Sequence, residues 1–246
     1  MQKALNHYAE VALSPNKIGL FLLGAVAMSG IGHIVVHSLA QYFDIESFPL
    51  MGVFRFFNMR DEGNLPSYIS ALNLLFAGSL CGLIFYHEAK LKKRTPWHWL
   101  GLCMLLLGMS LDEAARIHDG IVGPLSAHFL GRGEGIFYYT WYLIYIPIVA
   151  SIGIIYIPFL KRLPLLFSSR FILAGAVFLS GAVGMEMVEA FLFSTGRNIT
   201  NRSVGLSVFF EETLEMLAVV ILIHTLLLYI STFGYALKLT TSSRSH

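Results

Sequence analysis

The sequence contains 246 residues, of which 56% are hydrophobic and 13% are charged, with a formal net charge of +2. The charged fraction is about half of the roughly 25% found in soluble domains, and the mean hydropathy is +0.67. These values indicate a single transmembrane domain over residues 1–246, and the small net charge gives no reason to expect a nucleic-acid partner. The two cysteines, Cys81 and Cys103, fall in apolar segments without a CxxC motif, so no disulfide framework is expected.

Six stretches reach the length of about 20 mostly apolar residues that a bilayer core requires. In chain order they cover residues 18–42, 68–87, 97–118, 137–160, 171–193 and 208–230. Helix breakers such as Pro66, Pro96 and Pro164 separate them. The sequence therefore predicts an all-α fold, a six-helix transmembrane bundle.

The distribution of Lys and Arg predicts the orientation of this bundle. The segment between the second and third helices reads HEAKLKKRTP, and the one between the fourth and fifth holds Lys161, Arg162 and Arg170. Both ends of the chain are basic, whereas the opposite connections carry arginine but no lysine. By the positive-inside rule we expect both termini to be cytoplasmic in a multi-pass protein of a bacterial inner membrane.

Acidic residues in and beside the predicted helices are the main functional signal. A carboxylate in the membrane costs roughly 2.5–3.5 kcal/mol even on a mild scale, so protons, arginines or a bound cation must compensate it. At about 1.5 Å rise per residue, the three acidic runs reach one depth in the outer half of the membrane. The runs are LDEAARIHDG, GMEMVEA and FFEETLEM, and their acids are Asp112, Glu113, Asp119, Glu186, Glu189, Glu211, Glu212 and Glu215.

The run on the third predicted helix has two interpretations. Asp112, Arg116 and Asp119 are spaced i, i+4, i+7 and share one helical face, so Arg116 could neutralise either aspartate. Glu113 and His118 point in other directions on the same helix. They are metal-ligand candidates, although a protonated His118 would also stabilise the negative end of the helix dipole.

The other two runs favour metal binding more strongly. Glu186 and Glu189 are spaced i, i+3, and the helix over residues 171–193 contains no Lys, Arg or His. Two ionised carboxylates this close repel each other, so a cation, a shared proton or an arginine from another segment must relieve them. Glu212 and Glu215 repeat this spacing, with Glu211 and Glu215 as the i, i+4 alternative. Glu211 and Glu212 lie at the start of the predicted helix, where acidic side chains stabilise the positive end of the helix dipole. This accounts for them in part, but it does not account for Glu215, which lies a turn deeper.

Other polar residues leave more than one interpretation open. His33 and His37 are spaced i, i+4, which suits either a shared ion or hydrogen bonds to carboxylates. His224 is interpreted as a core histidine, and whether these three histidines are ligands stays open. The segment RDEGNLPSYIS, with Asp61 and Glu62, either covers the acids or simply starts the second helix. The run FYYTWYLIY is interpreted as an aromatic belt at the membrane interface.

Three resemblances accompany these observations. The acid runs resemble the ligand set of bundle di-metal carboxylate proteins, but the second ligand of each pair is Glu in place of His. The segments DEGNLPSYIS, LDEAARIHD and EETLEM resemble a group of uncharacterised bacterial multi-pass membrane proteins, which implies no function. Intramembrane hydrolases of the alkaline ceramidase type are loosely similar in their acidic-Asn-Ser run before an early helix, but this chain lacks their late HxxxH.

The resulting hypothesis is a metal site, dinuclear, in the outer half of the bundle. An oxygen-rich site with a histidine suits divalent Fe, Mn or Zn. An enzyme of this kind would be a hydrolase or oxygenase acting on a lipid-like or apolar substrate among the membrane lipids. The alternatives are a proton- or cation-coupled transporter or an accessory subunit of a larger membrane complex. The candidate protein partners are a second copy of this chain, in a homo-oligomer, or another subunit of a membrane complex. The expected ligands are Asp112, Glu113, His118, Glu186, Glu189, Glu212 and Glu215.

Overall fold

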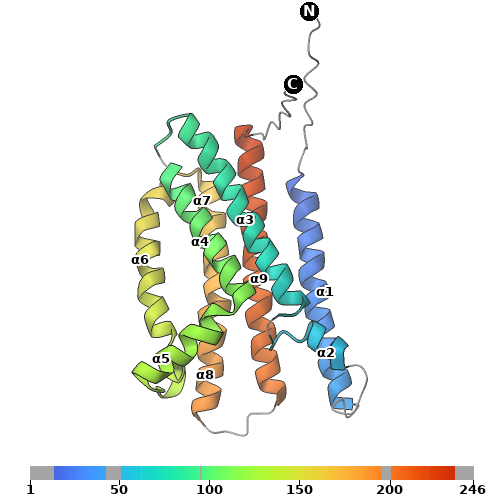
Figure 1. Cartoon of the computed structure of the whole chain (residues 1–246). Coiled ribbons are helices and arrows are strands. Elements are labelled where there is room, and N and C mark those ends of the chain that lie inside the picture. The colour runs from blue at the N-terminus through green and yellow to red at the C-terminus, as the bar shows by residue number, and fades with distance from the viewer. Residues whose placement is uncertain (1–13, 43–50, 62, 95, 196–200, 236–246) are drawn as a thin grey trace, which may run out of the picture.

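The computed structural model describes residues 14–42, 51–61, 63–94, 96–195 and 201–235. Within these residues the chain forms helices, turns and bends but no strand, which confirms the all-α prediction (Figure 1). The α-helices are α1 (Pro15–Tyr42), α2 (Met51–Phe57), α3 (Leu65–Lys90), α4 (Pro96–Ala115), α5 (Gly123–Leu130), α6 (Tyr142–Leu160), α7 (Leu165–Leu179), α8 (Glu186–Ser194) and α9 (Asn201–Phe233). Two π-helices, η2 (His118–Val122) and η4 (Ser180–Met185), and one 3-10 helix, η3 (Gly135–Phe137), lie between them.

Five helical segments of the described chain are long and apolar enough to cross a membrane. They are α1, α3, α6, α9 and the continuous run of α7, η4 and α8. The remaining predicted segment, residues 97–118, forms α4, which packs along α3. The chain is therefore a helical bundle with the character of a multi-pass membrane protein.

The prediction of a continuous helix to residue 118 is wrong in one respect. The α-helix ends at Ala115, because Arg116 has a φ of 56° and adopts the left-handed conformation that breaks a right-handed helix. The face that Asp112, Arg116 and Asp119 would share on one helix therefore does not exist. The side chain of Asp119 lies outside the described part of the structure.

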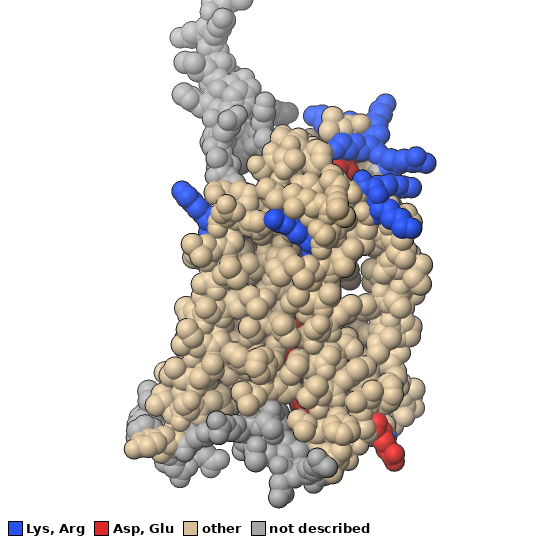
Figure 2. All heavy atoms as spheres, turned by 180° about the vertical axis from the view of Figure 1, so that it is seen from behind, with Lys and Arg blue, Asp and Glu red and all other residues tan. Residues whose placement is uncertain are grey.

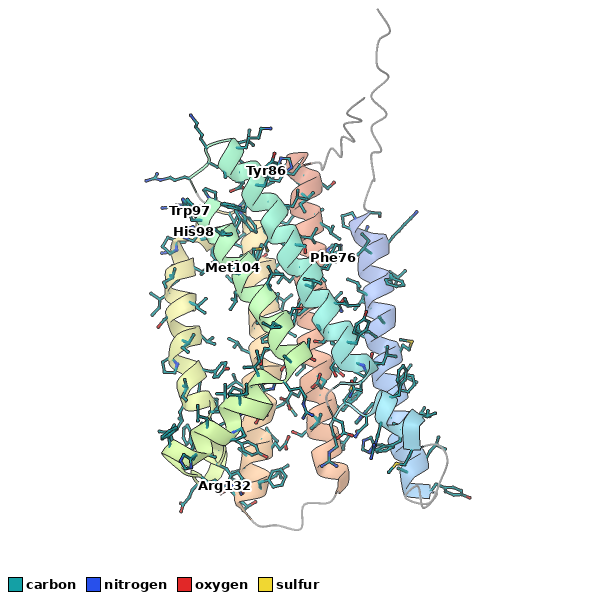
Figure 3. All side chains as sticks on the ribbon, viewed as in Figure 1. Phe76, Tyr86, Trp97, His98, Met104 and Arg132 are labelled. Carbon is teal, nitrogen blue, oxygen red and sulfur yellow. The ribbon has the colours of Figure 1, made fainter. Side chains whose placement is uncertain are left out.

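The two ends of the bundle differ in charge. The start of α1, the end of α9 and the turn from α3 to α4 lie at the same end (Figure 1). Lys and Arg side chains gather at this end, which we call the basic end (Figure 2). Figure 3 shows Tyr86, Trp97 and His98 near the basic end and Arg132 at the opposite one.

Aromatic side chains pack tightly near the basic end. Trp99 of α4 and Phe159 of α6 are fully buried, with their ring centroids 5.0 Å apart. Tyr229 of α9 lies 5.0 Å from Trp99 and 5.0 Å from Phe167 of α7. Away from this contact α6 is exposed. Of the residues in its most apolar 18-residue stretch, 6% are buried, against 50% in the corresponding stretch of α9. Most of α6 is thus available to lipid.

Candidate metal centre

The π-helix η4 leads directly into the first two acids of the site. It ends at Met185, and Glu186 and Glu189 occupy the first turn of α8. A π-helix admits an extra residue per turn and so changes the direction in which the following side chains point, and such segments are frequent at functional sites. Both glutamates are half-buried.

A glycine allows α9 to approach this segment closely. A Cβ added to Gly181 of η4 would lie 2.8 Å from the backbone oxygen of Glu211 and 3.0 Å from Cγ of Glu215. Real Cβ atoms do not approach a backbone oxygen so closely, so any larger residue would push α9 away. Gly181 therefore determines how near the acids of α9 lie to those of α8.

Three carboxylates meet at this contact. Oxygen atoms of Glu186, Glu189 and Glu211 all lie within 4.8 Å of one another. We call these three residues the acid triad. The sequence favoured Glu212 from α9, whereas the structure brings Glu211 to the triad, because the backbone of Glu211 is the part of α9 that rests on Gly181. Glu212 interacts electrostatically with Glu211 but is not one of the three.

Two aromatic residues donate hydrogen bonds to the acid triad. Trp141 Nε1 donates to Glu186 Oε1 at 3.1 Å, and the Tyr139 hydroxyl donates to Glu189 Oε1 at 3.4 Å. Burial, together with the charges of Glu189 and Glu186, raises the pKa of Tyr139 above its ordinary value, so the phenol stays a neutral donor. The interpretation of FYYTWYLIY as only an interface belt missed these contacts. The available signal was the polar atom that a buried Tyr or Trp usually pairs.

The break at Arg116 folds the chain back onto Asp112. The backbone nitrogen of His118 donates to Asp112 Oδ1 at 2.7 Å, and His118 Nδ1 donates to Asp112 Oδ2 at 3.2 Å. A carboxylate on one ring nitrogen fixes the orientation of a histidine whose other nitrogen binds a metal. The His118 ring lies 6.2 Å from that of Trp141, which bonds to the acid triad.

Glu215 connects the two halves of the site. Its carboxylate interacts electrostatically with Glu113, His118, Glu186 and Asp112. Residues from α4, η2, α8 and α9 therefore form one polar region. Besides Glu186 and Glu189 within the triad, the structure thus places Asp112, Glu113, His118 and Glu215 in this region, each of which the sequence singled out.

The remaining histidines have other hydrogen-bond partners. His33 Nδ1 accepts a bond from the backbone nitrogen of Met59 at 3.1 Å, and His37 Nε2 donates to Asn58 Oδ1 at 2.9 Å. His224 contacts Arg170 and Asn16 at 3.2 and 3.0 Å. These bonds fasten α1 to its neighbours, which is a structural role.

The segment before α3 also has a structural explanation. Asn64 is the N-cap of α3 and forms a capping box with Ser67, as an ordinary helix start does. Asp61 accepts a bond from Asn58 at 2.7 Å. Glu62 lies outside the described residues.

Comparison with known proteins identifies a family but no activity. No curated protein and no solved structure matches the chain. One family model matches residues 17–230, a range that contains all three acid runs. The chain therefore belongs to the family described as a domain of unknown function, DUF8692.

Proposed function

We propose that this protein binds a divalent metal at the acid triad of a membrane-embedded bundle. The observation that supports it is the mutual distance of at most 4.8 Å among the oxygens of Glu186, Glu189 and Glu211. Three ionised carboxylates at this separation repel one another strongly, and one divalent cation relieves all three. Carboxylate oxygens are also preferred ligands of hard divalent ions.

The neighbouring residues would complete a dinuclear site. Glu215 and Glu113 add carboxylates, and Asp112 holds Nδ1 of His118 so that Nε2 can serve as a ligand. The mixture of oxygen ligands with one imidazole favours Fe, Mn or Zn. Glu212, next to Glu211, stays a predicted ligand of the second ion.

The topology we propose has six membrane helices, with α4 as the sixth and the basic end in the cytoplasm. The accumulation of Lys and Arg at one end of the bundle supports this orientation. The metal site would then lie toward the outer face of a bacterial inner membrane.

A cavity beside the site supports an apolar substrate. It has a volume of about 530 Å³ and lies between α6 and η4, with Gly184 in its wall two residues before Glu186. A metal here would activate water or dioxygen, which makes a hydrolase or an oxygenase acting on a lipid-like molecule the expected enzyme class. The lining is almost wholly apolar: Ile146, Val149, Ala150, Leu179, Ser180, Val183 and Gly184.

Elemental analysis of the detergent-purified protein tests the proposal. We expect stoichiometric metal in the wild-type protein and a large loss in Glu189→Ala. Glu134→Ala is the matched control, because Glu134 is an exposed acid beside η3 and outside the triad. Metal content at background level, or equal content in both variants, would refute the site.

A flux assay separates catalysis from transport. We expect no metal uptake by proteoliposomes that contain the wild-type protein, because an enzyme retains its ion. Uptake that is lost in Glu189→Ala would instead assign the triad to a cation transporter.

A further inference from the structure

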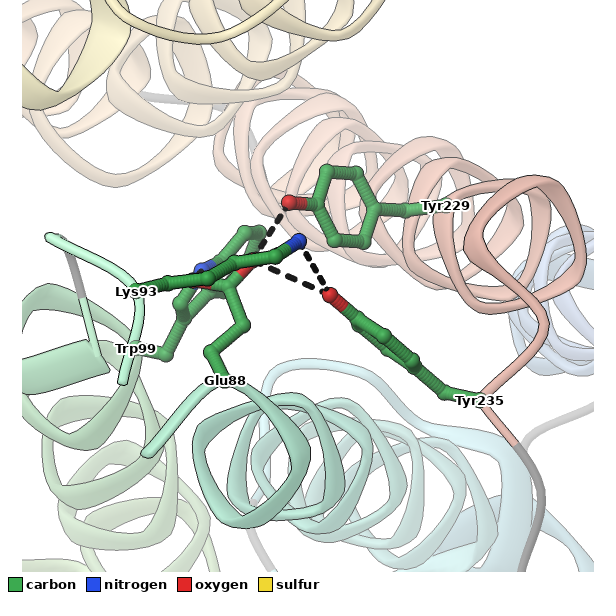
Figure 4. A network of polar contacts seen from close by, with 5 residues as sticks. All are labelled: Glu88, Lys93, Trp99, Tyr229 and Tyr235. Carbon is green, nitrogen blue, oxygen red and sulfur yellow. Dashed lines mark hydrogen bonds and ion pairs between the residues drawn. The ribbon is translucent and has the colours of Figure 1, made fainter. Parts of the chain in front are cut away.

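A second polar network joins Glu88, Lys93, Trp99, Tyr229 and Tyr235 (Figure 4). It lies near the ends of α3 and α9, at the basic end of the bundle (Figure 1). Glu88, near the end of α3, is only 1% exposed. Its carboxylate accepts bonds from Trp99 Nε1 at 3.0 Å, from the Tyr229 hydroxyl at 2.6 Å and from the Tyr235 hydroxyl at 3.4 Å. Lys93 Nζ lies 3.5 Å from the same carboxylate. The charge of Glu88 is therefore compensated within the protein.

Lys93 is held in place by the same network. Its ammonium donates to the Tyr235 hydroxyl at 2.5 Å and lies 4.8 Å from the centre of the Phe233 ring. Burial alone would lower the pKa of Lys93, but the bond with Tyr235 and the charge of Glu88 outweigh it. The net shift is upward, so the ammonium stays charged.

A cavity of about 360 Å³ opens beside this network. Three cations line it: Lys93 and Arg94 from the turn between α3 and α4, and Arg162 from the turn between α6 and α7. Tyr229 and Phe233 of α9 supply aromatic surface. With Glu88 already compensated, the lining has an excess of positive charge.

The cavity lies beside the ends of three candidate membrane-spanning helices, where lipid headgroups are expected. The membrane-spanning part of α3 ends at Lys90, that of α6 at Leu160 and that of α9 at Phe233. The lining residues stand within a few positions of these ends. Basic pockets between helices on the cytoplasmic side are suited to phospholipid headgroups, and the planar guanidinium of Arg binds phosphate through paired hydrogen bonds.

We propose that this cavity binds the phosphate of an anionic phospholipid. Arg94 and Arg162 would contact the phosphate oxygens. Lys93, held beside α9 by Tyr235, would add a further positive charge, and Phe233 would face the glycerol region. The inference does not depend on the metal site, because the two sites share no residue.

Native mass spectrometry of the full chain in detergent tests the lipid site. The probes are phosphatidylglycerol, phosphatidylcholine and glycerol 3-phosphate. We expect one tightly held phosphatidylglycerol and an affinity at least about tenfold lower in the double variant Arg94→Gln with Arg162→Gln, since each basic residue near a membrane surface contributes about 1 kcal/mol. Either single variant should lose part of the affinity and serves if the double variant does not fold.

The matched control removes the same charge from the same two turns. Lys92 and Lys161 are exposed and do not line the cavity, so Lys92→Gln with Lys161→Gln should retain the lipid. Equal losses in the two double variants would overturn the proposal, because they would show only general attraction to the basic end. Equal binding of phosphatidylcholine would also overturn it. Binding of glycerol 3-phosphate without any lipid would assign the cavity to a soluble phosphate ester instead.

Discussion

The buried carboxylate of Glu88 and the half-buried carboxylates of the acid triad lie near opposite ends of the bundle, and their surroundings are opposite in kind. Glu88 is a single acid with four donors around it, Trp99, Tyr229, Tyr235 and Lys93. The acid triad brings one oxygen from each of three carboxyl groups within 4.8 Å of the others, and the aromatic donors to Glu186 and Glu189 are neutral. A carboxylate that is paired in this way fastens helices together, whereas facing carboxylates repel one another, and a bound cation or proton relieves that repulsion. The first arrangement indicates structure and the second indicates a binding site.

Removing Glu88 should give the largest effect on stability. Glu88→Ala would leave Lys93 and the buried polar atoms of Trp99 and Tyr229 without their shared acceptor, and each buried polar group left unsatisfied costs about 1–3 kcal/mol. Unfolding of the purified protein in mixed detergent measures this loss. Glu134→Ala is the exposed control and should change the free energy of unfolding by less than about 0.5 kcal/mol. Similar values for the two variants would contradict a structural role for Glu88.

Metal should stabilise the protein through the acid triad only. At a free metal concentration about 100 times the dissociation constant, binding adds about 2.7 kcal/mol to the free energy of unfolding. We expect this gain in the wild-type protein, its loss in Glu211→Gln and its partial retention in Glu212→Gln. Thermal unfolding with and without a chelator checks it. The reverse order of the two variants would show that Glu212, as the sequence suggested, is the principal ligand.

Gly181 should be intolerant of even one methyl group. Gly181→Ala would force α9 away from η4 and cost about 1–3 kcal/mol, as overpacking does, and it should also weaken metal binding. Gly175→Ala in α7 is the matched control, because a Cβ there meets nothing within 4 Å. The measurement is the unfolding free energy of both variants, together with their metal content. A neutral Gly181→Ala would mean that close packing of α9 does not build the site.

The smallest expected effect on the free energy of unfolding should have opposite signs at the two ends of the bundle. In the metal-free protein at neutral pH, Glu211→Gln removes an acidic group whose ionisation is opposed by Glu186 and Glu189, and it should stabilise the fold by up to about 1 kcal/mol. Glu88→Gln removes the counter-charge of Lys93 and should destabilise it. Chelator-treated samples of both variants, compared by thermal unfolding, check the signs. Destabilisation in both would show that the triad is already neutralised within the protein.

The sequence predicted the helices better than their contacts. Apolar length located the five helical segments of the described chain that are long and apolar enough to cross a membrane, and the Asn64-Leu65-Pro66 start of α3 is confirmed as a cap. The break at Arg116 was missed, because nothing local to LDEAARIHDG requires a left-handed residue. That conformation is maintained by the contacts of Asp112 with His118, which form only after the chain has turned.

The site was predicted in part, for a similar reason. Periodicity identified Glu186 and Glu189, but the choice between Glu211 and Glu212 depends on where Gly181 lets α9 rest. The Glu88 network joins residues more than 140 positions apart, such as Glu88 and Tyr229. Single-sequence patterns contain no information about such pairings.

The two π-helices have a mechanical consequence. π-helices are rare and occur mostly as single-turn bulges that interrupt α-helices, so we expect η2 and η4 to be the points at which the helices deform most easily. η2 begins at His118 and η4 ends next to Glu186 of the acid triad, whereas the aromatic side chains around Trp99 pack near the basic end. We therefore expect the molecule to deform beside its carboxylates and to stay rigid at its basic end. A change in ionic radius or coordination number could be absorbed locally, without repacking the bundle.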